Sequence, residues 1–163
     1  MKAPGAEWIS EPGVEGKDTP DGQPPDLSYH VGTDERAAQE LFSGGTGVEY
    51  QGRKGSLHLG VEPAEGLGED GVPRHNILAC PPTGQKCTEE AAPNGAKMIF
   101  LGATYGDVQT YGYEVGLPDG RILRITHSND LSADGAGAAQ KGTPLTSDQV
   151  KAIAIDVASQ IKA

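Results

Sequence analysis

Hydrophobic and polar residues alternate most clearly in two stretches, Val108 to Leu117 and Arg121 to His127, on either side of Pro118-Asp119-Gly120. Because successive side chains of a strand point to opposite faces, this pattern predicts an antiparallel hairpin. We expect the tyrosines of the first arm to be half-buried packing residues. The residues that share a face are Tyr111, Tyr113, Val115 and Leu117 in the first arm, and Leu123, Ile125 and His127 in the second.

A second hairpin is predicted earlier in the chain. Its arms are Gly47 to Gln51 and Ser56 to Glu62, joined by Gly52-Arg53-Lys54-Gly55. The second arm alternates between apolar and other residues. His58 should therefore point away from the apolar face, which is formed by Leu57, Leu59 and Val61.

Two short apolar runs, Ile77 to Cys80 and Met98 to Leu101, predict two further buried strands. The connection from Pro63 to Arg74 is rich in glycine and acidic residues and shows no apolar periodicity. We expect it to be a loop.

Two helices are expected. The first covers Asp34 to Phe42, because Thr33 is a good N-cap residue and acidic side chains occupy the first turn. The second opens with a capping box, Thr146-Ser147-Asp148-Gln149. It should pack on a sheet, because one face collects Val150, Ile153, Ala154, Val157 and Ile161.

These elements predict a single α+β domain over residues 27–163. We expect a mainly antiparallel sheet of about five or six strands, with the C-terminal amphipathic helix packed on it and one short N-terminal helix. Residues 1–26 are rich in Gly, Pro, Asp and Glu and predict a flexible or clamped arm. Within that arm, Trp8 and Ile9 are expected to dock on the domain core.

Composition and charge narrow the picture. Hydrophobic residues make up 36% of the 163 residues and aromatic residues 5%, beside 24 Gly and 12 Pro, so the core should be lean. The formal net charge of −10 repels phosphate backbones and anionic lipid surfaces. We therefore expect no nucleic-acid partner. We also expect no membrane span, because the chain has no apolar run of about 18 residues or more.

The only two cysteines, Cys80 and Cys87, enclose a short run of turn-forming residues. This spacing favours a disulfide, which requires an oxidising compartment and contributes on the order of 2 to 3 kcal/mol in the chain-entropy model. The alternative is two free thiols. If the disulfide forms, we expect a signal peptide or membrane anchor to precede the chain in a longer precursor, because the chain itself has no basic start followed by an apolar stretch.

Catalytic and cofactor-binding patterns are weak. Asp130 to Gly135 matches the first half of a calcium loop, but Lys141 occupies the position of the bidentate acid, so neither a metal nor another cofactor is expected. No Gly-x-Ser-x-Gly motif presents a nucleophile. Four histidines receive no role from the sequence: His30, His58, His75 and His127. The candidate interaction residues are Trp8, Tyr111 and Tyr113.

Four features follow one another along the chain: the Cys80 to Cys87 loop, a strand after Asn94-Gly95, Pro118-Asp119-Gly120-Arg121 entering a strand that leads to Asn129, and Pro144-Leu145-Thr146 with Gln149 opening the last helix. In this order the chain resembles the extracytoplasmic domains of actinomycete (streptomycete-type) lipoproteins and single-pass, anti-sigma-factor-like membrane proteins of unknown function. The resemblance implies a location outside the membrane, a sheet with packed helices, and sensing or interaction rather than catalysis. PepSY-type domains also pair a hairpin with a helix, but here the helix follows the hairpin.

The sequence therefore favours a non-catalytic, extracytoplasmic binding or sensory domain that recognises a protein or a cell-envelope component. Two alternatives stay open. A secreted carrier of small molecules or lipids would need an apolar cavity between sheet and helix. A secreted hydrolase would need a site assembled from scattered histidines and acidic residues.

Overall fold

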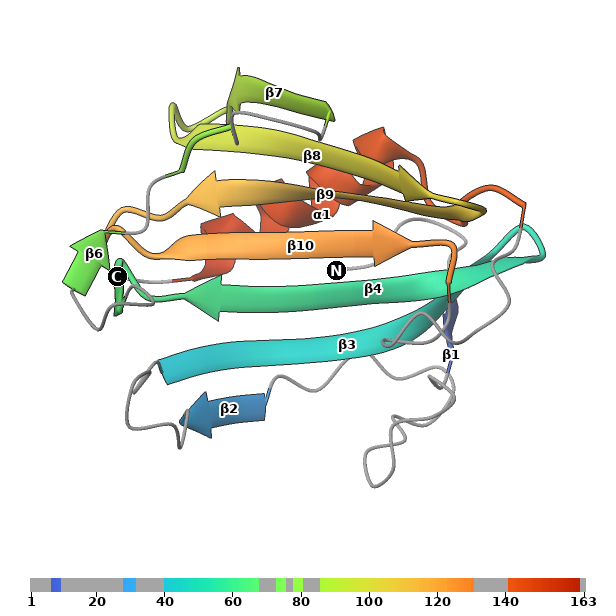
Figure 1. Cartoon of the computed structure of the whole chain (residues 1–163), viewed down its shortest axis with the longest axis horizontal. Coiled ribbons are helices and arrows are strands. Elements are labelled where there is room, and N and C mark those ends of the chain that lie inside the picture. The colour runs from blue at the N-terminus through green and yellow to red at the C-terminus, as the bar shows by residue number, and fades with distance from the viewer. Residues whose placement is uncertain are drawn as a thin grey trace.

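An antiparallel sheet with a helix packed on one of its faces makes up the fold (Figure 1). The computed structural model describes residues 7–9, 28–31, 40–67, 73–75, 78–80, 86–130 and 141–161. The expected α+β class, with a mainly antiparallel sheet and a C-terminal helix, is confirmed.

Six strands form the body of the sheet, in the spatial order β3, β4, β10, β9, β8 and β7. Two short strands, β1 (Glu7–Ile9) and β2 (Ser28–Val31), both pair with the outer edge of β3. A separate small sheet pairs β5 (Glu65–Leu67) with β6 (Pro73–His75). The bounds of the six main strands are Glu40–Tyr50 (β3), Arg53–Glu62 (β4), Lys86–Ala91 (β7), Lys97–Tyr105 (β8), Val108–Gly116 (β9) and Ile122–Ser128 (β10).

The hairpin of β3 and β4 is longer than the sequence indicated. Its turn consists of Gln51 and Gly52 alone, whereas the sequence pattern assigned residues 52–55 to it. The two turn residues have positive φ angles of 52° and 74°, as a two-residue type I′ turn requires. Arg53 and Lys54, which were expected in the turn, belong to β4.

The hairpin of β9 and β10 is confirmed with the predicted faces. Its turn is closed by the Gly120 N–H, which donates to the Leu117 carbonyl oxygen at 3.0 Å. Gly120 has a φ of 88°, a conformation that glycine adopts without steric cost. β8 pairs with the other edge of β9, so β8, β9 and β10 are neighbours in the sheet as well as along the chain.

The C-terminal helix α1 spans Ser147–Gln160 and lies behind the sheet in Figure 1. Both bonds of the predicted capping box are present. The Thr146 hydroxyl accepts from the Gln149 N–H at 3.3 Å, and the Gln149 side chain accepts from the Thr146 N–H at 2.8 Å. The buried residues of α1 are Val150, Ile153, Ala154 and Val157, as predicted, whereas Ile161, the fifth residue of the expected face, is the C-cap residue and is only partly buried.

The main core lies between α1 and the sheet. Its strand residues alternate along each strand, so they all point to the face that α1 covers. Each fully buried Val, Leu or Ile contributes about 1.5 to 3 kcal/mol relative to an exposed one. The members from outside α1 are Val48, Leu57, Leu59, Val61, Met98, Tyr113, Val115, Leu117, Leu123, Ile125 and Leu145. Within the described ranges, no helix has the length and apolarity that crossing a membrane requires.

The expected N-terminal helix is wrong over its last three residues, the part of it that the structure describes. Its last residues, Glu40, Leu41 and Phe42, lie in β3, and the preceding part, residues 34–39, lies outside the described residues. Pairing with β2 and β4 places these residues in a strand. This is a case of tertiary context overriding local propensity, because a helical pattern of a few residues is a weak signal.

Three segments between β4 and β8 differ from the sequence prediction. Residues 63–74, expected as a loop, contain β5 and the start of β6. Residues 78–80, expected in a buried strand, form none, and Ile77 lies outside the described residues. β7 was not predicted, because an edge strand needs no continuous apolar face, and charged residues dominate its sequence.

The predicted N-terminal arm, residues 1–26, is described only at Glu7–Ile9. There its backbone is clamped to the sheet, with Trp8 opposite Val48 in the register. The side chains of Trp8 and Ile9 are outside the described set, so their docking on the core stays a prediction. The domain boundary at residue 27 also stays a prediction.

The capping box gives the first testable prediction. Replacing Thr146 with alanine (Thr146→Ala) should lower the free energy of unfolding by about 1 kcal/mol, because one N-terminal N–H of α1 loses its acceptor. The measurement is equilibrium unfolding in urea. Thr146→Ser is the matched control, since it keeps the hydroxyl and should keep most of the stability. Equal losses in both variants would show that the cap contributes nothing.

Candidate functional site

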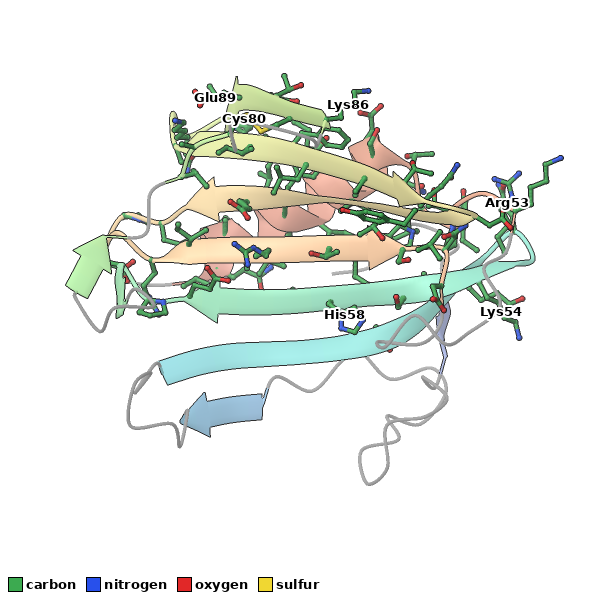
Figure 2. The ribbon with its side chains drawn as sticks, in the orientation of Figure 1. Arg53, Lys54, His58, Cys80, Lys86 and Glu89 are labelled. Carbon is green, nitrogen blue, oxygen red and sulfur yellow. A yellow bond between two sulfur atoms is a disulfide. The ribbon has the colours of Figure 1, made fainter. Side chains whose placement is uncertain are left out.

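The strand register divides the sheet into a face covered by α1 and a helix-free face. Residues opposite one another on neighbouring strands point to the same side. Leu123, Val115 and Met98 are opposite one another and are buried under α1. The alternate residues face the viewer in Figure 2. One row of them crosses six strands and consists of Cys87, Leu101, Gly112, Thr126, His58 and Gly45.

A shallow hollow of about 180 Å³ lies in the middle of this row, above Gly112. Its floor is backbone, because Gly112 has no side chain. Pockets that hold drug-sized ligands measure about 300 to 1,000 Å³, so this hollow has room for a side chain rather than for a ligand of that size. The walls are apolar along β8, with Leu101 and Ala103, and polar along β9 and β10, with Thr110, Glu114, Arg124 and Thr126.

The glycine at the floor is required by the approach of two strands. A Cβ atom at position 112 would overlap the carbonyl oxygen of Ile125 and lie 3.1 Å from the Cα atom of Thr126. Glycine inside a strand often marks such a close approach. The absent side chain therefore allows β9 and β10 to pair here and also leaves the hollow open.

An arginine with two carboxylate partners forms one wall of the hollow. Arg124 Nη1 lies 2.6 Å from Glu62 Oε1, and Arg124 Nε lies 2.8 Å from Glu114 Oε1. The Arg124 side chain is 46% exposed, so solvent screens both pairs and each contributes at most about 1 kcal/mol. Their main effect is geometric: they fix the orientation of the guanidinium and of Glu114 beside the hollow.

The predicted disulfide is present on the same face. Cys80 is bonded to Cys87, with the two Cα atoms 5.7 Å apart, and Cys87 lies opposite Leu101 in the register. We call residues 78–80 the strap. Its other end lies over β9, where Leu78 Cδ2 is 3.6 Å from the position that a Cβ atom of Gly116 would take. In Figure 2, Cys80 lies in front of the sheet where β7 and β8 meet.

Ile99 is fully buried although it points away from α1. It lies opposite Glu114 in the register and does not belong to the cluster under the helix. Its place on β8 is between the row of Gly116, over which one end of the strap lies, and the row of Cys87, to which the other end is bonded. The strap therefore passes over Ile99, and the disulfide fastens a small second cover on the helix-free face.

Of the four histidines, His127 has a clear structural role. Its side chain is fully buried, and its Nε2 accepts from the Leu145 N–H at 3.1 Å. Nδ1 must then carry the ring proton, which it donates to the Ser56 carbonyl oxygen at 2.7 Å. Burial lowers the pKa of His127 to about 4, although the hydrogen bond to Ser56 acts in the opposite direction. The neutral imidazole thus joins β10, β4 and the start of α1.

The two predicted interaction tyrosines belong to the helix-covered side. Tyr113 is only 4% exposed, and its side chain packs in the core under α1, although the residue is also among those that line the hollow. Burial, with the negative charges of Glu90 and Asp148 nearby, raises its pKa to about 12. Tyr111 is half-buried; its hydroxyl is hydrogen-bonded to the Leu145 carbonyl oxygen and lies 3.0 Å from the Thr143 hydroxyl. Burial also raises the pKa of Tyr111.

The remaining predicted residues are not brought together. His58 is half-buried on the helix-free face of β4, and His30 and His75 lie in β2 and β6, where side chains are outside the described set. The side chain of Trp8 is outside it as well. Among the side chains that the structure describes, no three His, Cys, Asp or Glu residues gather as metal ligands would. Residues 131–135 of the rejected calcium loop also lie outside the described part.

Sequence reasoning missed the centre of the site. Gly112 was one of 24 glycines, and only the register shows that it lies between an apolar strand and a charged one. A partial signal existed for Arg124 and Thr126, because the predicted alternation of β10 already placed both opposite its apolar face.

Comparisons with known proteins add no relative: no family model matches the chain, and no curated protein or solved structure matches it significantly. The likeness to actinomycete extracytoplasmic domains therefore stays a prediction.

Acid should destabilise the protein through His127. In the unfolded chain a histidine takes up its proton near pH 6.5, but His127 resists protonation until about pH 4. The contribution of the neutral His127 to the free energy of unfolding is therefore complete above pH 6.5. It is lost as the pH falls to 4, which lowers the free energy of unfolding by about 3 kcal/mol. Unfolding free energies measured across this range, with an NMR titration of the His127 ring, test it.

The matched control is His58→Gln on the opposite face, which should retain this loss. His127→Gln removes the titrating group and should flatten the dependence on pH. A His127 ring that takes up its proton between pH 6 and 7 in the folded protein would contradict the prediction.

Proposed function

We propose that this chain is a non-catalytic, extracytoplasmic binding or sensory domain that recognises a protein through the hollow above Gly112. The observation that carries the proposal is the hollow itself, which combines an apolar wall from Leu101 and Ala103 with oriented polar groups from Glu114 and Arg124. Protein interfaces have this anatomy, in which an anchoring side chain enters a small apolar site surrounded by polar groups.

The size of the hollow favours a protein partner over a small ligand. About 180 Å³ accommodates an apolar side chain, and the open sheet around it can contact the backbone that carries that side chain. Thr110 and Thr126 offer hydroxyl groups to such a backbone. A cell-envelope component that presents a similar short apolar group is the related possibility within the same class.

The disulfide supports a location outside the membrane. Disulfides persist in oxidising compartments and are rare in the cytosol. The resemblance to secreted or anchored actinomycete domains points the same way, and we include secretion and lipoprotein anchoring in the proposal.

The two alternative classes have less support. A carrier would need an apolar cavity between sheet and helix, where Val150, Ile153 and Ala154 are instead packed against the core. A hydrolase would need a histidine bonded to a serine side chain or a carboxylate. His127 instead bonds only backbone groups with its two ring nitrogens.

Photo-crosslinking tests the proposal. A photoreactive residue at position 103, in the wall of the hollow, should crosslink a protein partner when the domain is expressed outside the membrane. The matched control is the same residue in place of Ala152, an exposed alanine of α1. Thr126→Trp, which fills the hollow, should weaken binding by about 30-fold or more, as removal of an interface hot spot does.

Three results would contradict the proposal: equal crosslinks from positions 103 and 152, crosslinks at position 103 that survive Thr126→Trp, or turnover of a substrate by the purified domain without a partner.

A further inference from the structure

We infer that the Cys80–Cys87 disulfide is a redox-operated latch that controls access to the apolar side of the binding hollow, an inference that rests on the proposed function of that hollow. The sequence alone indicates a disulfide that staples the fold. The geometry points to a local role instead, because the bond fastens only the strap to a strand that is already held by other contacts.

The strand β7 has its own restraints. It pairs with β8 along its whole length, from Lys86 opposite Gly102 to Ala91 opposite Lys97. The turn between the two strands is closed by the Ala92 N–H, which donates to the Ala96 carbonyl oxygen at 2.8 Å. On the helix side, Glu90 forms an ion pair with Lys151 of α1. Loss of the disulfide therefore leaves β7 in the sheet.

The strap covers apolar surface that continues into the hollow. Along the helix-free face of β8, the alternate residues are Ile99, Leu101, Ala103 and Tyr105. Ile99 is fully buried, Leu101 and Ala103 line the hollow, and Tyr105 is 67% exposed. When the strap is fastened, this apolar stripe ends at the disulfide beside Leu101. When the strap is released, Ile99 joins the stripe and lengthens the surface available to a partner.

The charges beside the strap match this role. Glu89 of β7 points to the helix-free face and pairs with Lys97 of β8 at 3.2 Å, on exposed positions next to Ile99. Such an exposed pair contributes little to stability, so it rims the covered site without holding it closed. The covalent bond is the strong restraint on the strap among the described contacts.

The chemistry is a thiol–disulfide exchange with a dithiol reductant. One thiolate of the reductant attacks a sulfur of the Cys80–Cys87 bond, and its second thiol then releases the protein. The protein gains two electrons and two protons as two thiols, and the reductant closes to its own disulfide. Both cysteines are half-buried rather than fully enclosed, which leaves a path for the attack.

Hydrogen–deuterium exchange on the intact chain, oxidised or reduced with dithiothreitol, tests the latch without any partner. Reduction should raise the exchange of the strap amides by about tenfold or more, while the amides paired between β7 and β8 keep their protection. The far-UV circular dichroism spectrum should stay unchanged. The double variant Cys80→Ser/Cys87→Ser should reproduce the reduced pattern without reductant.

A fluorescent apolar dye reports the exposed surface. Dye binding should rise on reduction, and the rise should be absent in Ile99→Ser, which removes the apolar group under the strap. The latch is overturned if exchange of the strap is unchanged by reduction. It is also overturned if both the reduced protein and the double variant lose the β7–β8 protection, because the disulfide would then be a staple of the whole sheet edge.

The two proposals fail separately. Exchange and dye binding test the latch alone, whereas crosslinking from position 103 in the oxidised protein tests the binding function alone. If both hold, reduction should change the yield of that crosslink, and an unchanged yield would show that the latch opens without regulating the hollow.

Discussion

The burial of one face of α1 against one face of the sheet is the interaction on which the rest of this structure depends. Val150, Ile153 and Val157 are buried there, and each contributes about 1.5 to 3 kcal/mol, which is more than a helix cap or an exposed ion pair contributes. Because side chains alternate along a strand, this one contact also decides what the opposite face contains. The candidate site is built from the residues that the helix does not cover.

The start of the helix is fixed by polar contacts as well as by apolar ones. Leu145 is buried, its N–H is bonded to His127, and its carbonyl oxygen is bonded to Tyr111. These bonds place the capping box at one end of the sheet. They also satisfy both backbone groups of Leu145 inside the protein, where an unpaired polar group would be costly. The same residues explain why a buried histidine is present at all: it supplies an acceptor on one side and a donor on the other.

The helix-free face combines small residues, paired charged side chains and one apolar stripe. Gly112 lets two strands approach closely and opens the hollow, while Arg124 holds Glu114 beside it. The strap covers the end of the stripe at Ile99. An exposed apolar surface of this kind is a common mark of an interaction site, and a fastened cover limits how much of it faces solvent. The proposed function and the proposed latch both follow from this arrangement.

By itself, the sequence determined the features that depend on local periodicity and spacing. These are the β9–β10 hairpin with its apolar face, the capping box and buried stripe of α1, and the bond between Cys80 and Cys87. It did not determine the edge strand β7 or the strand character of Leu41 and Phe42. The strand character of Leu41 and Phe42 depends on pairing with β2 and β4, and the charged sequence of β7 has no apolar alternation that would indicate a strand. Only the tertiary structure decided that Gly112, Arg124 and Ile99 share one face with the disulfide, because that face is defined by the register between strands, and periodicity within a strand carries no information about register.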